Sequence, residues 1–155
     1  MTGPVTDAGT QPLPTVEDTL AFGERVGREL RAGDVVVLSG PLGAGKTVVA
    51  KGIAHGMGVE GPITSPTFVL ARVHRARAPG RPSMVHVDVY RLRDGGDLLA
   101  ELDSLDLDTD LDEAVAVVEW GEGLAERLSE HHLDITLTRL PHSETRTAVW
   151  RWSGS

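Results

Sequence analysis

Two short stretches of the chain, residues 34–38 and 114–118, are apolar almost without interruption. Runs of this length predict strands that are buried inside a sheet. A third stretch, residues 84–90, alternates between apolar and polar side chains, which is the pattern of a strand whose two faces differ. The hydrophobic pattern alone therefore predicts three strands of a sheet.

Two other stretches have the period of an amphipathic helix. In the first, Thr15 is suited to the N-cap, Asp18 follows three residues later, and Gly33 ends the helix. The second carries an apolar face over residues 48–57 and is followed by Gly58, a suitable C-cap. This second helix comes after a buried strand and a glycine-rich loop, so the three segments form a strand–loop–helix unit.

A segment rich in proline and glycine, residues 79–82, separates two predicted strands, which should therefore form an antiparallel hairpin. The further elements expected are strands at residues 68–73, 133–138 and 145–152 and helices at residues 97–102 and 121–130. This order predicts a single α/β domain over residues 15–153 with a mixed central sheet. Residues 1–14 are rich in Gly, Pro and Thr and predict a flexible N-terminal arm.

With 155 residues, the chain is long enough for one domain with a substantial core. It contains no cysteine, so disulfides and thiolate metal sites are excluded. No apolar run has the length of a membrane span and no signal peptide pattern is present, so we expect a cytoplasmic protein without membrane contact. The net charge of −8 argues against direct nucleic-acid binding by this chain alone.

The glycine-rich loop, residues 40–47, fits the phosphate-binding pattern G-x-x-x-x-G-K-[ST]. Its backbone N–H groups can surround an anion, Lys46 can reach the β and γ phosphates, and the Thr47 hydroxyl can hold Mg²⁺. We therefore predict a P-loop NTPase-like three-layer domain that binds a nucleotide. The loop and helix residues expected at the nucleotide are Gly40, Leu42, Gly43, Ala44, Gly45, Lys46, Thr47 and Val48.

ATP chemistry at a P-loop also needs carboxylates, which hold Mg²⁺ and orient the attacking water. Glu119 ends a fully apolar strand and should reach the sheet edge where the P-loop lies, although a surface acid that opens a helix is its alternative. Asp88 lies within the half-polar strand, where a solvated strand residue is an equal alternative. His86 and Tyr90 share the face of Asp88 and either orient that carboxylate or line a half-buried surface.

Other residues leave two interpretations open. Trp120 either packs on a nucleotide or a partner, or belongs to the core. Thr67 either contacts the metal or the γ phosphate, or only begins a strand. The chain has no asparagine, so the guanine-reading Asn-Lys-x-Asp motif is absent and adenine is favoured. A group of arginines forms either a solvated hairpin or a basic patch that docks a partner or approaches phosphate. These are Arg72, Arg75, Arg77, Arg81, Arg91 and Arg93.

Several separate motifs together resemble the TsaE (YjeE) family. They are the P-loop at residues 40–47, Ser-Pro-Thr-Phe at 65–68, His-Val-Asp-Val-Tyr-Arg-Leu at 86–92 and Val-Glu-Trp at 118–120. The resemblance extends from about residue 13 to residue 135, and its motifs follow the order of the family. One departure is Val48, where the family often has a second threonine after Lys-Thr.

The resemblance implies a small bacterial ATPase that is needed for the N6-threonylcarbamoyladenosine (t6A) modification of tRNA and works with the TsaB–TsaD pair. In that family TsaD performs the carbamoyl transfer, and ATP hydrolysis supports turnover of the complex. By matching motif, the site consists of Lys46 and Thr47 for phosphate and Mg²⁺, the catalytic carboxylates Asp88 and Glu119, the neighbouring Trp120, and Thr67 in a switch-like loop at the metal.

We therefore expect a Mg²⁺-dependent ATPase that acts on a protein complex, meets tRNA only indirectly and is a monomer on its own. Its turnover should be slow without partners, because the sequence places no arginine finger. Two alternatives stay open. One is a small-molecule kinase whose lid is the arginine-rich hairpin, and the other is a non-catalytic module whose binding depends on the nucleotide.

Overall fold

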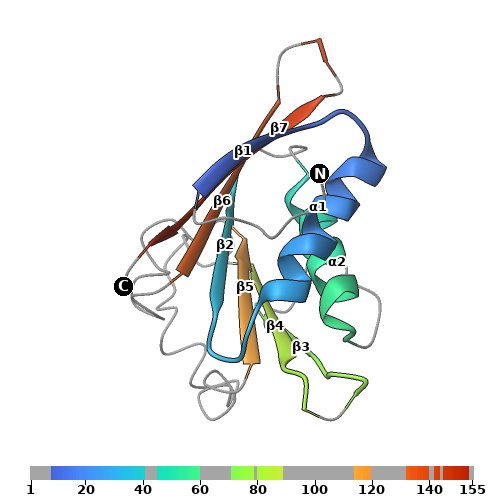
Figure 1. Cartoon of the computed structure of the whole chain (residues 1–155), viewed down its shortest axis with the longest axis vertical. Coiled ribbons are helices and arrows are strands. Elements are labelled where there is room, and N and C mark those ends of the chain that lie inside the picture. The colour runs from blue at the N-terminus through green and yellow to red at the C-terminus, as the bar shows by residue number, and fades with distance from the viewer. Residues whose placement is uncertain are drawn as a thin grey trace.

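The computed structural model describes residues 8–40, 45–59, 71–78, 80–88, 114–119, 132–139, 142–143 and 145–153. Within these ranges the chain forms seven strands and two helices (Figure 1). In chain order they are β1 (Ala8–Leu13), α1 (Val16–Glu29), β2 (Val35–Ser39), α2 (Lys46–Met57), β3 (Ala71–His74), β4 (Ser83–Asp88), β5 (Ala114–Glu119), β6 (His132–Arg139) and β7 (Arg146–Ser153).

The strands form one sheet in the order β1-β7-β6-β2-β5-β4-β3. The inner strands β6, β2, β5 and β4 run parallel to one another. On one side β7 and β1 extend the sheet with antiparallel pairing, and on the other side β3 forms an antiparallel hairpin with β4. The structure thus confirms the predicted α/β fold, with its mixed sheet and hairpin.

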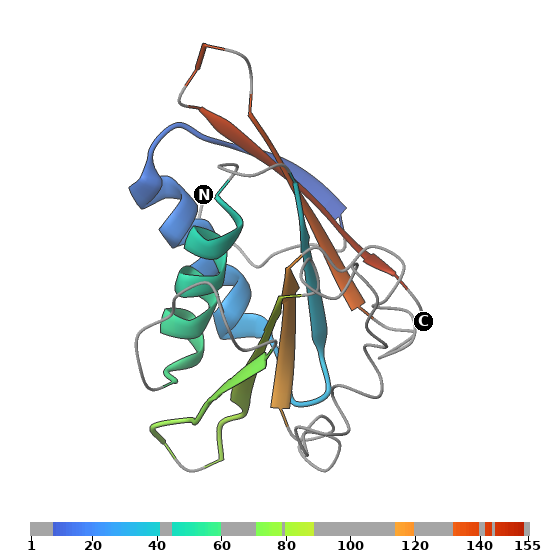
Figure 2. The same cartoon turned by 180° about the vertical axis from the view of Figure 1, so that it is seen from behind.

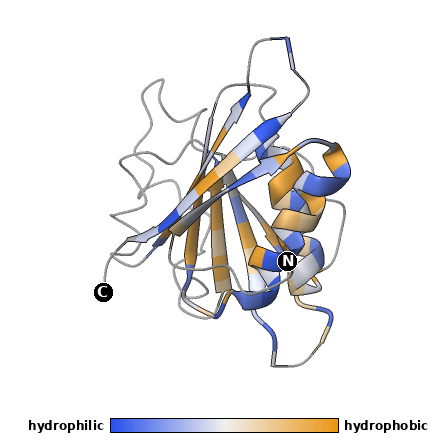
Figure 3. Cartoon of the chain, turned by 45° about the horizontal axis from the view of Figure 1, so that its top comes forward, coloured by the Kyte–Doolittle hydropathy of each residue, from blue (hydrophilic) through white to orange (hydrophobic). Residues whose placement is uncertain are grey.

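Both described helices lie on the same face of the sheet (Figures 1 and 2). Every residue of β2 and β5 is buried, as the two apolar runs predicted. Side chains of the helices and the sheet form one hydrophobic cluster, in which Phe22 of α1 and Ile53 of α2 are fully buried. Figure 3 shows hydrophobic residues concentrated in the central strands. Neither described helix is long and apolar enough to cross a membrane.

Helices α1 and α2 contact each other through glycines. Gly23 and Gly27 of α1 lie against the stretch of α2 that contains Gly52 and Gly56. A Cβ atom at Gly27 would lie 2.3 Å from the carbonyl oxygen of Ile53, much closer than two non-bonded atoms approach. The two helices therefore meet backbone to backbone. Because α2 begins at the P-loop, this contact fixes where the P-loop helix lies on the sheet.

The predicted flexible arm is wrong for residues 8–13, which form β1 and pair with β7. The indole ring of Trp150 on β7 packs over Gly9, where a Cβ atom would lie 2.4 Å from a ring carbon. Pro12 is tolerated because β1 is at the edge of the sheet. The apolar contact thus comes from β7, which is why the composition of the first residues misled the prediction.

Two predicted helices, at residues 97–102 and 121–130, lie outside the described residues. The outer ends of the predicted hairpin strands, residues 68–70 and 89–90, lie outside them as well. Within the described ranges, the strands predicted near the C-terminus are found as β6 and β7.

Candidate nucleotide-binding site

The P-loop joins the end of β2 to the beginning of α2, and its two ends are described. Gly45 is the N-cap of α2 and has a left-handed backbone with φ of 103°, a conformation that favours glycine. Lys46 turns back across the loop, and its Nζ donates a hydrogen bond of 2.6 Å to the carbonyl oxygen of Gly40. Its side chain is thereby held at the end of the strand that precedes the loop, and its contact with phosphate stays a prediction.

The beginning of α2 has the electrostatics of an anion site. Gly45 has no side chain that could cap the first turn of the helix, and that turn contains no acidic residue. The N–H groups at the start of a helix and the helix dipole together favour negative charge at this end. Val48 lies in the first turn of the helix and is half-buried. Leu42, Gly43 and Ala44, predicted to line the nucleotide, lie outside the described residues.

Parallel pairing brings the two predicted acids to the same edge of the sheet. Leu38 of β2 pairs with Glu119 of β5, and Glu119 pairs with Asp88 of β4. The P-loop leaves β2 only two residues after Leu38, so both acids are at strand ends beside it. The backbone of Asp88 therefore lies at the same end of the sheet as Glu119, while its side chain is outside what the structure describes and its catalytic role stays a prediction.

Glu119 is directly connected to the P-loop helix. The Thr47 hydroxyl donates a hydrogen bond of 3.2 Å to Glu119 Oε1. Glu119 is only 3% exposed, which contradicts the alternative of a surface acid. A hydroxyl and a carboxylate oxygen that converge at the start of the helix are hard oxygen donors, and they fit a Mg²⁺ ion.

His86 contacts a different carboxylate from the one that sequence reasoning gave it. Its Nε2–H donates to Glu119 Oε2 over 2.5 Å, across from β4 to β5. The His86 side chain is completely buried, so the alternative of a half-buried surface is wrong for it. The two-residue period placed His86 beside Asp88, whereas contact with Glu119 depends on the register between two strands far apart in sequence.

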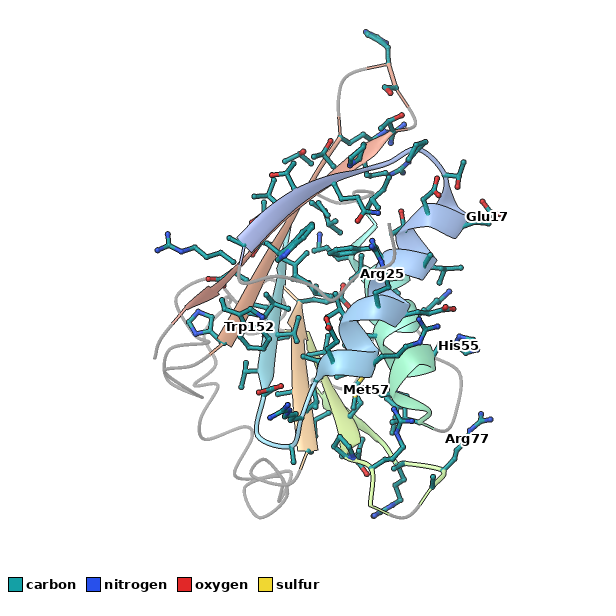
Figure 4. All side chains as sticks on the ribbon, viewed as in Figure 1. Glu17, Arg25, His55, Met57, Arg77 and Trp152 are labelled. Atoms are coloured by element: carbon teal, nitrogen blue, oxygen red, sulfur yellow. The ribbon has the colours of Figure 1, made fainter. Side chains whose placement is uncertain are left out.

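Arg77 and Arg81, in the connection between β3 and β4, are at the other end of α2 from the P-loop. The Arg81 guanidinium donates a hydrogen bond of 3.1 Å to the Gly56 carbonyl, and the Arg77 backbone N–H donates one of 3.0 Å to the Gly58 carbonyl. Figure 4 shows the Arg77 side chain pointing away from the strands. Arg75, Arg77 and Arg81 therefore do not approach the P-loop, which contradicts the predicted approach to phosphate for these three residues and leaves the docking of a partner as a prediction.

The remaining predicted positions are not tested by the structure. Thr67, Trp120, Tyr90, Arg91 and Arg93 lie outside the described residues. The structure therefore brings together Gly40, Lys46, Thr47 and Glu119, and adds His86 to them.

A P-loop that follows one parallel strand, beside a second strand that ends in a buried carboxylate, defines a P-loop NTPase-like protein. The crystal structure of YdiB from Bacillus subtilis is similar, with a TM-score of 0.71 and 27% sequence identity. The match covers 98% of this chain and 90% of that chain.

The family model of the threonylcarbamoyl adenosine biosynthesis protein TsaE matches residues 13–148. The tRNA threonylcarbamoyladenosine biosynthesis protein TsaE of Mycobacterium bovis is 71% identical over 153 residues, covering 97% of this chain and 91% of that protein. The protein of the same name in Bacillus subtilis is 35% identical over 137 residues, covering 86% of this chain and 81% of its own. The chain therefore belongs to the TsaE family of tRNA threonylcarbamoyladenosine biosynthesis, as its motifs predicted.

Proposed function

We propose that this chain is a Mg²⁺-dependent ATPase of the cytoplasm that serves t6A modification of tRNA by acting on the TsaB–TsaD pair. The observation that carries the proposal is the hydrogen bond between Thr47 and Glu119. It joins the P-loop helix to the acidic end of a neighbouring strand. Hydrolysis of a nucleoside triphosphate needs both parts, because one binds phosphate and the other handles the metal and the water.

The phosphate side of the site is formed by Lys46 and the beginning of α2. The Lys46 ammonium is already directed at the loop by its bond to Gly40, so little side-chain freedom is lost when a phosphate takes over that bond. The uncapped N–H groups of the first helical turn add further donors. These groups stabilise the charge on the transferred phosphoryl group without forming a covalent bond to it.

The metal side of the site is formed by oxygen donors. When bound, Mg²⁺ neutralises phosphate charge that protein cations alone leave uncompensated. The predicted candidates to hold it are Thr47, Glu119, Asp88 and Thr67. Because Glu119 shares its carboxylate with the Thr47 hydroxyl, we assign Glu119 to the metal and Asp88 to the orientation of the attacking water.

A partner complex would activate a site to which the described residues bring no arginine. The described arginines of the β3–β4 hairpin are remote from the P-loop, which disfavours a kinase with that hairpin as its lid. With no arginine brought to the phosphates by the described residues, we expect slow hydrolysis by the chain alone. A partner complex can accelerate it, and it can also bring the tRNA that this acidic chain contacts only indirectly.

The test is ATP hydrolysis by the purified chain, alone and with TsaB and TsaD from the same organism. Lys46→Ala should abolish turnover in both conditions. Lys51→Ala is the matched control, because Lys51 is an exposed lysine on the same helix and should leave turnover unchanged. Normal turnover by Lys46→Ala would refute the site. Tight ATP binding without turnover, even with both partners, would instead support a non-catalytic binding module.

A further inference from the structure

Glu119 is held at both carboxylate oxygens by side chains from two other elements. Oε1 accepts from the Thr47 hydroxyl at the beginning of α2, and Oε2 accepts from the His86 imidazole on β4. The carboxylate and the imidazole are buried almost completely, with side-chain exposures of 4% and 0%. Two hydrogen bonds in different directions fix the plane of the carboxylate, which a single bond would leave free to rotate.

A second buried histidine next to a carboxylate provides an internal comparison. His132, at the beginning of β6, lies 3.3 Å from Asp134 Oδ2, but that carboxylate is 46% exposed and is two residues along the same strand. The beginning of β6 is at the opposite sheet edge from the ends of β4 and β5. The His132–Asp134 pair is thus similar in composition, while the His86–Glu119 pair is shorter, fully buried and beside the P-loop.

The His86 ring is costly to bury unless it has a specific task. Its Nδ1 has no hydrogen-bond partner in the described part of the chain. A buried polar atom without a partner destabilises the folded state, and an apolar side chain would fill a core position next to Met84 and Val85 without that cost. The imidazole is explained by its other nitrogen, Nε2, which donates to the Glu119 carboxylate of the site.

We propose that His86 is a positioning residue, which fixes Glu119 so that Oε1 stays directed at Thr47 and at the cation. This inference rests on the proposed function, since it gives Glu119 its metal. His86 does not touch nucleotide or metal in this assignment and acts only through Glu119. Its removal should therefore weaken the response to Mg²⁺ and leave metal-free contacts between Lys46 and phosphate intact.

The test compares two substitutions of His86 in a nucleotide-binding titration. His86→Gln keeps an N–H donor at a similar distance from the backbone, whereas His86→Met keeps volume without a donor. A fluorescent ATP analogue is titrated with Mg²⁺ from zero, and the Mg²⁺ concentration for half-maximal tightening is measured. We expect this concentration to rise about 10–100-fold in His86→Met, as for other outer partners of metal ligands, and only a few-fold in His86→Gln.

The matched control is His132→Met, which removes a buried histidine outside the site and should leave the Mg²⁺ response unchanged. A wild-type Mg²⁺ response in His86→Met, or an equal shift in His132→Met, would overturn the inference. So would a glutamine variant that is no better than the methionine variant. If the wild type itself neither binds nor hydrolyses ATP, the proposed function fails instead, so the two failures are distinguishable.

A measurement on the unsubstituted side chain decides the matter if His86→Met does not fold. Imidazole nitrogen NMR of the wild type should show a protonated His86 Nε2 whose proton exchanges slowly with water. In Glu119→Ala this protection should be lost, while the signals of His132 stay unchanged. An unprotonated Nε2 in the wild type would overturn the inference.

Discussion

The two regions that define the P-loop helix are constructed in opposite ways. Where α2 meets α1, glycines on both helices bring backbone against backbone, and a side-chain pair between His55 and Glu24, 2.7 Å apart, lies at the exposed margin of this contact. Where α2 begins, polar side chains from three elements meet: Thr47 from α2, Glu119 from β5 and His86 from β4. The first contact sets the position of the helix, and the second uses that position. Damage to the first should therefore lower stability, whereas damage to the second should lower activity.

The largest effect is expected from Glu119→Gln. This change keeps the size of the side chain and removes its charge, so the metal loses an anionic ligand. We expect the rate of ATP hydrolysis to fall at least about 100-fold, which corresponds to about 2.7 kcal/mol in the barrier. The melting temperature should change by only a few degrees, because glutamine keeps the size of the side chain and its contacts with neighbouring residues.

Glu17→Gln is the control for this prediction, because Glu17 is an exposed residue of the first turn of α1 (Figure 4). It should hydrolyse ATP at the wild-type rate. Hydrolysis by Glu119→Gln within a factor of about three of the wild type would contradict the comparison, since that difference is under 1 kcal/mol.

The next effect in size is expected at the helix contact, in Gly27→Ala. The new methyl group would lie 2.3 Å from the Ile53 carbonyl oxygen, so the helices must separate. Overpacking of this kind costs about 2–3 kcal/mol in the free energy of unfolding, measurable by urea titration. Nucleotide affinity should fall as well, because the displaced helix carries Lys46 and Thr47.

Gly58→Ala separates the close contact from the general cost of replacing glycine. At Gly58 an alanine is strained by the left-handed backbone, whose φ is 72°, but its Cβ atom would meet nothing within 4 Å. The strain of a left-handed alanine is about 1 kcal/mol. If Gly27→Ala were no less stable than Gly58→Ala, the helices would not be in the contact described.

Much of this fold was predictable because it depends on local patterns. The runs that became β2 and β5 are apolar throughout, and the Thr15–Asp18 signal for the start of α1 is confirmed as a capping box. Strand β1 escaped prediction because its apolar partner, Trp150, is on β7 at the far end of the sequence. Local composition does not reveal a contact of that kind.

The candidate site divides in the same way. Lys46 and Thr47 were predictable because the P-loop is contiguous in sequence, and Glu119 because an acid after an apolar strand must lie at the sheet edge. The link from His86 to Glu119 was not predictable, since it depends on which strand is next to β4 and in which register. The available signal was a histidine within a predicted strand. The alternating pattern assigned it to a half-polar face, whereas the structure buries it completely.

A smaller effect on stability is expected from Thr15→Ala at the beginning of α1. The Thr15 hydroxyl accepts from the Asp18 backbone N–H, and the Asp18 carboxylate accepts from the Thr15 backbone N–H. Loss of this cap should lower the free energy of unfolding by about 1 kcal/mol. Thr10→Ala on β1 is the control, and it should be nearly neutral. Because the cap bonds lie within the first turn of α1 and involve none of Lys46, Thr47 and Glu119, ATP hydrolysis below the melting transition should be unchanged in both variants.

The smallest effect is expected from Arg81→Ala, at the end of α2 remote from the P-loop. The Arg81 guanidinium donates to the Gly56 carbonyl in the last turn of the helix, where a positive charge also interacts favourably with the helix dipole. Because Arg81 is exposed, we expect a loss of only about 0.5 kcal/mol in unfolding free energy, which should shrink further at high salt. Arg75→Ala is the matched control, since Arg75 is an exposed arginine of the same hairpin and makes no hydrogen bond to α2 among the described residues. If Arg81→Ala slowed ATP hydrolysis under conditions in which the protein stays folded, this end of α2 would also serve the site.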